Sequence, residues 1–542
     1  MLLAEVAETS RALAATRSRT AKTALLADLL SRAQPAEVGP VVGYLIGDPR
    51  QGRIGVGWSA LAKVLPASEG EHDGQGATAE SAEPAASDAY DEVAARVLQS
   101  SSEGSQGLEV LDFDAALDRL AATRGVGSAA QRDALLRELL APASRAEQQL
   151  MTAVFMGEVR HGALDGVLVT GIAAAAGVAV DVVQRAYMLS GDLRVTASLA
   201  LTGGADALTS VGLEVLRPVR PMLAATAAGV TEALALTGAA SVEFKLDGAR
   251  IQVHRDGPDV RVYTRSLADM THRVPEVVAV ARALPVNQVV LDGESLALDS
   301  DSRPRAFQDT MSRFGADAPR EQLLRPYFFD VLHVDGVDLL DRPLAERLDV
   351  LERVAADWRV PGVLTADGSA GEQVLADALA AGHEGVVVKA LDAPYAAGRR
   401  GGSWRKVKPV RTLDLVVLAA EWGHGRRVGW LSNLHLGARD PDGTYGEPGG
   451  FVMVGKTFKG LTDALLTWQT AALQEVEQRR TRGTVWVRPT LVVEIALDGA
   501  QQSPRYPGGV ALRFARVLRY RDDKSAEETD TIQDVRALLP GR

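Results

Sequence analysis

The most constraining stretch of the chain is Ser241–His254, where apolar residues alternate on both sides of an Asp247-Gly248 pair. This pattern predicts two strands joined by a tight turn, that is, a β-hairpin. Because side chains alternate along a strand, Glu243 and Lys245 share one face of the first strand. The residues leave two interpretations open: a lysine that reaches solvent from a hairpin, or a lysine nucleophile. An amine attacks phosphorus only when neutral, so the second interpretation requires burial of Lys245 or positive charge beside it.

The length of the chain, 542 residues, exceeds what one hydrophobic core supports and predicts about two to four domains. Hydrophobic content of 46% and charged content of 24% are those of a soluble globular protein rather than a disordered or fibrous one. The first residues, 1–6, lack a signal-peptide layout, and no apolar run is long enough to span a bilayer. We therefore expect a cytoplasmic protein.

Cysteine is absent, which excludes disulfides, thiolate catalysis and cysteine-ligated zinc. The net charge of −11 argues against a nucleic-acid partner, but the distribution of charge matters more than its sum. Residues 64–95 contain many acids and no Lys or Arg, whereas residues 399–411 contain Lys and Arg and no acid. The chain, although acidic as a whole, therefore contains one basic segment at residues 399–411.

Hydrophobic periodicity predicts a multidomain fold. Residues 1–210 form an all-α helical domain, interrupted by a disordered acidic insert at 66–91. The two prolines in residues 217–224 exclude regular helix and predict a linker into a second domain, α+β, over 211–411. Short strands with polar breaks over 412–542 predict a small β-barrel that holds one clear helix, residues 464–479.

Several segments carry residues suited to phosphoryl chemistry. Glu294 follows a strand and turn, Glu384 begins a β-branched strand, and Lys406 and Lys408 share one face of a strand. Each segment alone also fits a solvated turn, a core strand or a salt-bridged surface. Together they supply a lysine, two carboxylates suited to Mg²⁺, cations for phosphates and an aromatic strand at 326–332 for a base. Transfer of a phosphoryl group requires mostly positioning and charge neutralisation, so the set predicts nucleotidyl transfer.

The segment Lys245-Leu246-Asp247-Gly248-Ala249-Arg250 resembles the K-x-D-G-x-R signature of the covalent nucleotidyltransferases. The other motifs of that family follow in the same order: Thr264-Arg265-Ser266, Leu291-Asp292-Gly293-Glu294, Phe328-Phe329-Asp330, Glu384-Gly385-Val386-Val387-Val388-Lys389, Trp404-Arg405-Lys406-Val407-Lys408 and Arg521-Asp522-Asp523-Lys524. Among these enzymes the chain most resembles three-domain ATP-dependent DNA ligases, with an OB-fold as the C-terminal barrel. The resemblance is specific over about 220–525 and only architectural over 1–210.

The resemblance implies a role for each matching position. Lys245 takes AMP from ATP, Glu243 contacts the adenine edge, and Phe329 stacks on its face. The remaining implied contacts are Arg250, Arg265 and Glu294 to ribose and phosphate; Glu294 or Glu384 to Mg²⁺, with Mn²⁺ as an alternative; Arg400, Lys406 and Lys408 to phosphates; and Arg519, Arg521 and Lys524 to the leaving pyrophosphate. Lys406 and Lys408 would also help to keep Lys245 neutral. The implied partner is nicked duplex DNA, bound by a monomer whose domains close differently for different steps.

Other classes of protein have similar sequence motifs and are alternatives to an ATP-dependent DNA ligase. An RNA ligase or an mRNA-capping-type guanylyltransferase has the same lysine chemistry, although the long helical domain fits encirclement of duplex DNA better. An NAD-dependent DNA ligase is disfavoured, because such chains carry a cysteine zinc module. A non-catalytic DNA-end-binding protein would have lost the motif lysine or carboxylates, which are all present here. The acidic insert is foreign to the family pattern and must point away from DNA, and Arg160 is a guess at a DNA contact in the helical domain.

Overall fold

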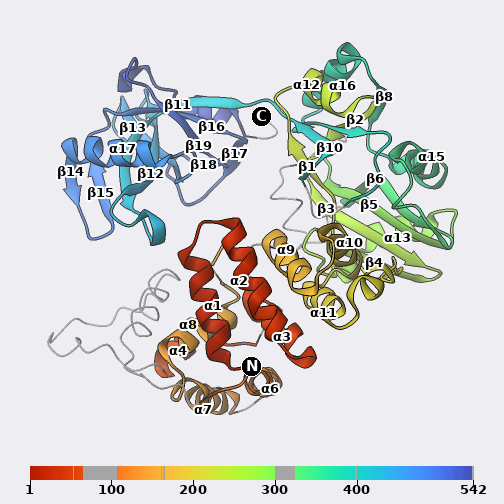
Figure 1. Ribbon diagram of the computed structural model, residues 1–542. Coiled ribbons are helices and arrows are strands. Elements are labelled where there is room, and N and C mark those ends of the chain that lie inside the picture. Colours follow the sequence, from red (N-terminus) through yellow and green to blue (C-terminus); the bar gives the residue numbers. More distant parts are fainter. Residues whose placement is uncertain are drawn as a thin grey trace.

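The computed structural model describes residues 1–52, 54–64, 107–125, 127–159, 161–162, 165–299, 305, 310, 324–396 and 400–539. These residues form three regions, drawn from red to blue along the chain in Figure 1: helical, then mixed, then β-rich. The predicted insert at 66–91 and Arg160 lie outside the described residues. No described helix is long and apolar enough to cross a membrane.

The N-terminal region is helical where it is described. Its elements are α1 (Leu3–Ala15), α2 (Arg19–Arg32), α3 (Pro35–Ile46), α4 (Trp58–Val64), α6 (Val110–Ala122), α7 (Ser128–Leu140), α8 (Arg145–Met156), α9 (Asp165–Ala176), α10 (Val180–Ser190) and α11 (Leu193–Thr209). One apolar core joins them. Helices α2 and α9 approach closely at Gly171, where an added Cβ would lie 2.7 Å from the Cβ of Leu26. Helices α9 and α10 are separated at Gly177, whose φ of +67° ends the first of them.

The central region contains two five-stranded sheets. One has the order β1-β10-β9-β2-β8 and the other β4-β3-β5-β6-β7. The elements are β1 (Leu223–Thr226), α12 (Val230–Thr237), β2 (Ala240–Lys245), β3 (Ala249–Asp256), β4 (Asp259–Thr264), α13 (Pro275–Ala283), β5 (Gln288–Ala297), β6 (Leu324–Val334), β7 (Val337–Asp338), α15 (Leu344–Ala355), β8 (Gly362–Thr365), α16 (Gly368–Ala380), β9 (Gly385–Ala390) and β10 (Arg400–Val407). Helices α12 and α16 pack on the first sheet, and α13 and α15 pack on the second.

The predicted hairpin at 241–254 is wrong. The strands β2 and β3 exist and alternate as expected, but they do not pair: β2 lies between β8 and β9, and β3 lies between β4 and β5. The Asp247-Gly248 segment instead carries the chain from one sheet to the other. It passes so close to β5 that a Cβ on Gly248 would lie 2.4 Å from the carbonyl oxygen of Ser295. Alternation depends on local backbone geometry, whereas the choice of partner strand is made by packing between distant segments.

The C-terminal region is β-rich and curves into a half-barrel. Its elements are β11 (Arg411–Trp422), β12 (Leu431–Asp440), β13 (Gly450–Thr457), α17 (Asp463–Glu475), β14 (Glu477–Arg480), β15 (Thr484–Val487), β16 (Val492–Leu497), β17 (Gly499–Gln502), β18 (Val510–Arg513), β19 (Arg516–Tyr520) and α18 (Ile532–Ala537). The long strand β11 pairs with β12 and β15, and also with β16. The helix expected at 464–479 is shorter than predicted: it ends at Glu475, and Glu477–Arg480 form a strand against β15.

The N-terminal and C-terminal regions share an exposed ion pair of Arg17 with Asp463, at 3.8 Å, and each of them also contacts the central region. The Arg185 guanidinium of α10 donates two hydrogen bonds of 2.7 Å to the Asp341 carboxylate, beside an apolar cluster shared by the N-terminal and central regions. From the C-terminal region, Arg513 Nη1 donates to Asp247 Oδ2 at 2.9 Å. The coarse fold prediction is therefore confirmed: a helical region, a mixed central region and a β-rich C-terminal region.

Candidate active site

The candidate site lies between the two central sheets, on the face of the first sheet that α12 and α16 leave uncovered. Directly paired residues of antiparallel strands share a face. Lys245 pairs with Gly385, Glu243 with Val387, and Ser241 with Lys389. Strand β10 continues these rows, because Lys406 pairs with Val387 and Trp404 with Lys389. The register thus collects three lysines, one carboxylate and one indole on a single face, as the alternation of each strand predicts.

Lys245 forms an ion pair with Glu384, the residue that precedes β9. The two side chains are 23% and 18% exposed, so the pair is shielded but open to a ligand. Gly385 allows the close approach of neighbouring strands, since a Cβ there would lie 2.2 Å from the carbonyl oxygen of Val407. A lysine held in an ion pair is not a nucleophile, so Glu384 must release Lys245 before any attack on phosphorus.

Strands β3 and β5 of the second sheet supply the charged side chains on the opposite side of the site from Lys245. Arg250 on β3 pairs with Glu294 on β5, and Asp292 lies two residues before Glu294 on the same face of β5. Arg250 donates to both carboxylate oxygens of Asp292, at 3.1 and 2.7 Å, and to the carbonyl oxygen of Met222 at 2.7 Å. The Tyr395 hydroxyl donates to Asp292 at 2.7 Å. Arg250 is therefore fixed in one orientation before any ligand arrives.

Glu294 has an unusual protonation equilibrium. Burial raises its pKa to about 7, although the positive charges of Lys245 and Arg250 act in the opposite direction. The electrostatic effect of both cations indicates that Glu294 lies near them. A carboxyl group that titrates near neutrality beside a lysine is typical of a functional site.

Glu243 and Lys389 form a second, deeper ion pair, with Nζ 2.5 Å from Oε2. Ser241 Oγ donates to the other oxygen of Glu243 at 2.7 Å. The Lys389 ammonium also lies 4.2 Å from the ring centroid of Phe329 and 4.5 Å from that of Trp404. Phe329, which sequence analysis assigned to a base, is therefore beside Glu243, which sequence analysis assigned to the edge of that base.

The other predicted site residues are distributed more widely, although Lys408 lies beside Gly385, the strand partner of Lys245. Arg265 is exposed in the loop after β4, and the side chain of Arg400 is outside the described part of the chain. Lys408 Nζ donates to Asp498 of the C-terminal region at 2.5 Å, so its charge is shared with a carboxylate. The ion pairs of Arg519, Arg521 and Lys524 in the described residues are all with acids of the C-terminal region: Glu494, Asp414 and Asp523.

Asp292, Lys389 and Tyr395 had no role predicted from the sequence, although the first two lie inside motifs. Lys389 pairs with Ser241, so the two side chains lie on the same face of the sheet. Strand alternation would have predicted this position only if the pairing of β2 with β9 had been known. No local sequence pattern identifies Tyr395. It lies in the loop after β9, and its hydroxyl reaches Asp292 of the other sheet.

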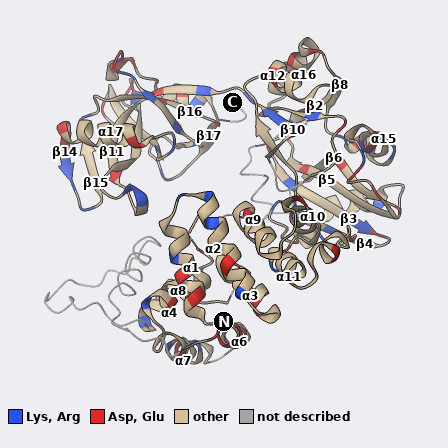
Figure 2. Cartoon of the chain, in the orientation of Figure 1, with Lys and Arg blue, Asp and Glu red and all other residues tan. Residues whose placement is uncertain are grey.

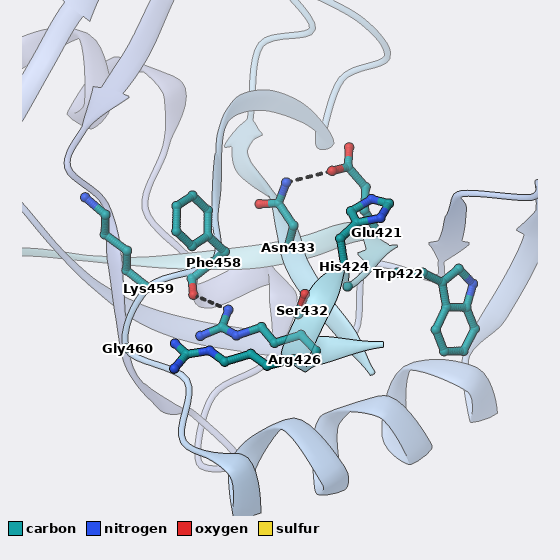
Figure 3. Close-up of a pocket in the computed structure, with 11 residues that line it drawn as sticks. Glu421, Trp422, His424, Arg426, Ser432, Asn433, Phe458, Lys459 and Gly460 are labelled. Carbon is teal, nitrogen blue, oxygen red and sulfur yellow. Dashed lines mark hydrogen bonds between the residues drawn. The ribbon is translucent and has the colours of Figure 1, made fainter. Parts of the chain in front are cut away.

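A separate pocket of about 520 Å³ lies in the C-terminal region, away from Lys245. Figure 3 shows its lining, which includes Arg426, Phe458 and Lys459. Glu421 at its edge accepts hydrogen bonds from Asn433 at 2.6 Å, from His435 at 2.9 Å and from Lys456. These donors, His435 first, lower the pKa of Glu421 to about 2. Because its only acid is already paired, the pocket presents positive charge.

Elsewhere, acidic and basic residues are interspersed over all three regions (Figure 2).

Comparison with known proteins agrees with the fold. Three family models match the chain in order: "DNA ligase N terminus" at residues 2–201, "ATP dependent DNA ligase domain" at 221–408 and "ATP dependent DNA ligase C terminal region" at 427–524. The fold and these matches define a nucleotidyl-transferring enzyme of several domains. The chain belongs to the ATP-dependent DNA ligases, which form phosphodiester bonds.

Relatives match along the whole chain. A "Probable DNA ligase" of Pseudarthrobacter chlorophenolicus is 59% identical over 99% of this chain and 100% of its own length. Another, from Rhodococcus jostii, is 54% identical over 100% of both chains. Among solved structures, "Pmar-Lig_PreS3" is similar in fold with a TM-score of 0.59 at 17% identity, covering 95% of this chain and 99% of that one.

Proposed function

We propose that this DNA ligase seals nicks in duplex DNA through a lysyl-AMP intermediate on Lys245. The neutral amine attacks the α-phosphorus of ATP, an N–P bond forms, and the bond to the β-phosphate oxygen breaks to release pyrophosphate. AMP then passes to the 5′-phosphate at the nick, and the 3′-hydroxyl displaces it. The observation that carries this proposal is the placement of Lys245, paired with Glu384 and facing Arg250 and Glu294 across the gap between the sheets.

We assign the nucleotide contacts as the motifs imply. Glu243 meets the adenine edge, and Phe329 meets the adenine face. Arg250, already oriented by Asp292, holds ribose and phosphate, with Arg265 contributing from its exposed loop. Lys406 on the floor of the site, with Arg400 and Lys408, contacts the phosphates.

The carboxylates suit a divalent cation. Glu294 and Glu384 both lie near Lys245, and carboxylate oxygens are preferred ligands of Mg²⁺. No group of three or more potential metal ligands occurs among the described residues. Mg²⁺ is typically held by one or two carboxylates and by phosphate oxygens. When bound, the cation neutralises charge on the phosphates. Glu294 and Glu384 would hold the cation, and Glu384 is at present the ion-pair partner of Lys245.

The C-terminal region moves between steps in this proposal. Arg519, Arg521 and Lys524 serve the leaving pyrophosphate only if the OB-fold that we assign to residues 412–542 rotates toward the nucleotide. In the arrangement described, the same region contacts the site through Arg513 instead. We assign residues 1–210 to DNA binding and 211–411 to adenylation, and we propose a monomer that closes around DNA. The cationic pocket of Figure 3 suits a DNA backbone phosphate.

The test is covalent labelling. Purified protein is incubated with α-labelled ATP and Mg²⁺, denatured, and examined for acid-labile label, beside Lys245→Ala and a control, Lys456→Ala, in a lysine of the C-terminal region that pairs with Glu421. We expect label on the wild type and Lys456→Ala but not on Lys245→Ala, and discharge of the wild-type label by nicked DNA into sealed product. Label from GTP but not ATP would indicate a capping-type enzyme, discharge by nicked RNA only would indicate an RNA ligase, and no label would leave a DNA-binding protein.

A further inference from the structure

We propose that Lys389 sets the nucleobase specificity of the site by holding Glu243 as an ionised acceptor, which favours a 6-amino purine nucleotide over a 6-oxo one. The inference rests on the proposed function, because it requires the base of a nucleotide joined to Lys245 to reach Glu243. Lys389 acts through Glu243 and is therefore a positioning residue rather than a catalytic one.

The Glu243–Lys389 pair is buried. Glu243 is 3% and Lys389 2% exposed. A carboxylate taken out of water favours its neutral form unless a cation or hydrogen-bond donors compensate for the lost hydration. Lys389 Nζ at 2.5 Å supplies the cation, and Ser241 Oγ at 2.7 Å supplies a further donor.

The Lys389 ammonium is itself fixed in place. It donates to the carbonyl oxygen of Phe329 at 3.2 Å and lies over the rings of Phe329 and Trp404. With the oxygen of Glu243, these groups surround the ammonium, so it does not extend to the phosphates near Lys245. Its charge therefore serves Glu243.

The pair lies where a base would lie. Glu243 and Lys245 share one face of β2 two residues apart, which is roughly 7 Å along a strand. A ribose and base extend over a similar length from a phosphorus bonded to Lys245 Nζ. In the next row, Trp404 Nε1 is buried and has no hydrogen-bond partner. A buried donor without a partner is uncommon, and a ring nitrogen of a bound purine would satisfy it.

The charge of Glu243 decides which purine fits. An ionised carboxylate only accepts hydrogen bonds. It accepts from the exocyclic amino group at position 6 of adenine and repels the oxygen at position 6 of guanine. A neutral carboxyl group can donate to that oxygen, so removal of the Lys389 cation weakens discrimination against guanine.

The experiment measures kcat/KM for lysyl-nucleotide formation with α-labelled ATP and GTP. For Lys389→Met we expect the ratio of ATP to GTP to fall by about tenfold or more, the range of a hydrogen bond to a charged group. Lys389→Arg keeps the cation and is expected to retain most of the wild-type ratio. The matched control is Lys456→Met, which removes a lysine from another carboxylate, Glu421, in the C-terminal region and is expected to leave the ratio unchanged.

An unchanged ratio in folded Lys389→Met overturns the inference. If that variant does not fold, Glu243→Gln decides, because an amide of the same size both donates and accepts and must lower the ratio. In the wild type, purine riboside triphosphate, which lacks the 6-amino group, must be used about tenfold less efficiently than ATP. Equal use of the two overturns the inference while leaving the ligase function intact. Failure of the proposed function is recognised separately, as no label on wild-type protein from any nucleotide.

Discussion

Arg513 Nη1 lies 2.9 Å from Asp247 Oδ2, and this ion pair joins the C-terminal region to the segment that connects the two central sheets. The side chains are 16% and 25% exposed, so the contact is partly shielded from water. Asp247 is two residues from Lys245. The C-terminal region is thus in direct contact with the motif that carries the nucleophile.

Substitution Arg513→Ala is expected to release the C-terminal region. A partly shielded pair contributes about 1 kcal/mol, so its loss shifts the equilibrium between docked and undocked arrangements about fivefold. Small-angle X-ray scattering is expected to show a larger radius of gyration for Arg513→Ala than for Arg516→Ala, a control at an exposed arginine nearby. Equal radii for the two variants would show that other contacts hold the region.

Substitution Asp292→Asn is expected to impair both stability and nucleotide transfer. Asp292 is 1% exposed and accepts from Arg250 and Tyr395, so its neutralisation leaves Arg250, whose side chain is only 15% exposed, without its counter-ion. We expect a loss of about 3–5 kcal/mol in the free energy of unfolding, measured by urea denaturation, and slower lysyl-AMP formation. Tyr395→Phe removes one hydroxyl and is expected to cost about 1 kcal/mol. Similar values for the two variants would contradict a dominant role for the Arg250 pair.

The stability of the metal-free protein is expected to depend on Glu294 between pH 4.5 and about 7. Burial raises the pKa of Glu294 from 4.5 to about 7, so over this range the folded state binds more protons than the unfolded state. The contribution of this group to stability is present at low pH and is lost as the pH rises through 7. Glu294→Gln cannot titrate, so the melting temperature of the wild type relative to this variant is expected to fall from pH 5 to 7.5 in EDTA. A constant difference would show that Glu294 titrates normally.

Substitution Arg426→Ala is expected to weaken DNA binding in a salt-dependent way. Arg426 is exposed at the pocket of Figure 3, whose only acid is paired. If it contacts one phosphate, the slope of log K against log salt concentration becomes less steep by about 0.9. Binding to nicked duplex DNA is measured by fluorescence anisotropy at several salt concentrations. Arg516→Ala serves as the control for loss of one charge, and an identical change in both variants would exclude a specific contact.

Sequence alone determined the family, the order of the three regions and the residue types of the site. It placed Glu243 and Lys245 on one face of a strand, because alternation follows from the backbone dihedrals of each strand and from nothing distant. The motif order also predicted that Arg250, Glu294 and Glu384 act with Lys245, and the structure brings these residues around the same gap.

Tertiary structure decided which strands are neighbours and which charges meet. The segment 241–254 was consistent with a hairpin, yet β2 and β3 lie in different sheets, so that both present side chains to one gap. The Glu243–Lys389 pair joins residues 146 positions apart, and the Arg513–Asp247 pair joins residues 266 apart. Such pairs follow from the packing of whole sheets and domains, where burial and the pairing of buried charges select among many arrangements that each strand allows locally.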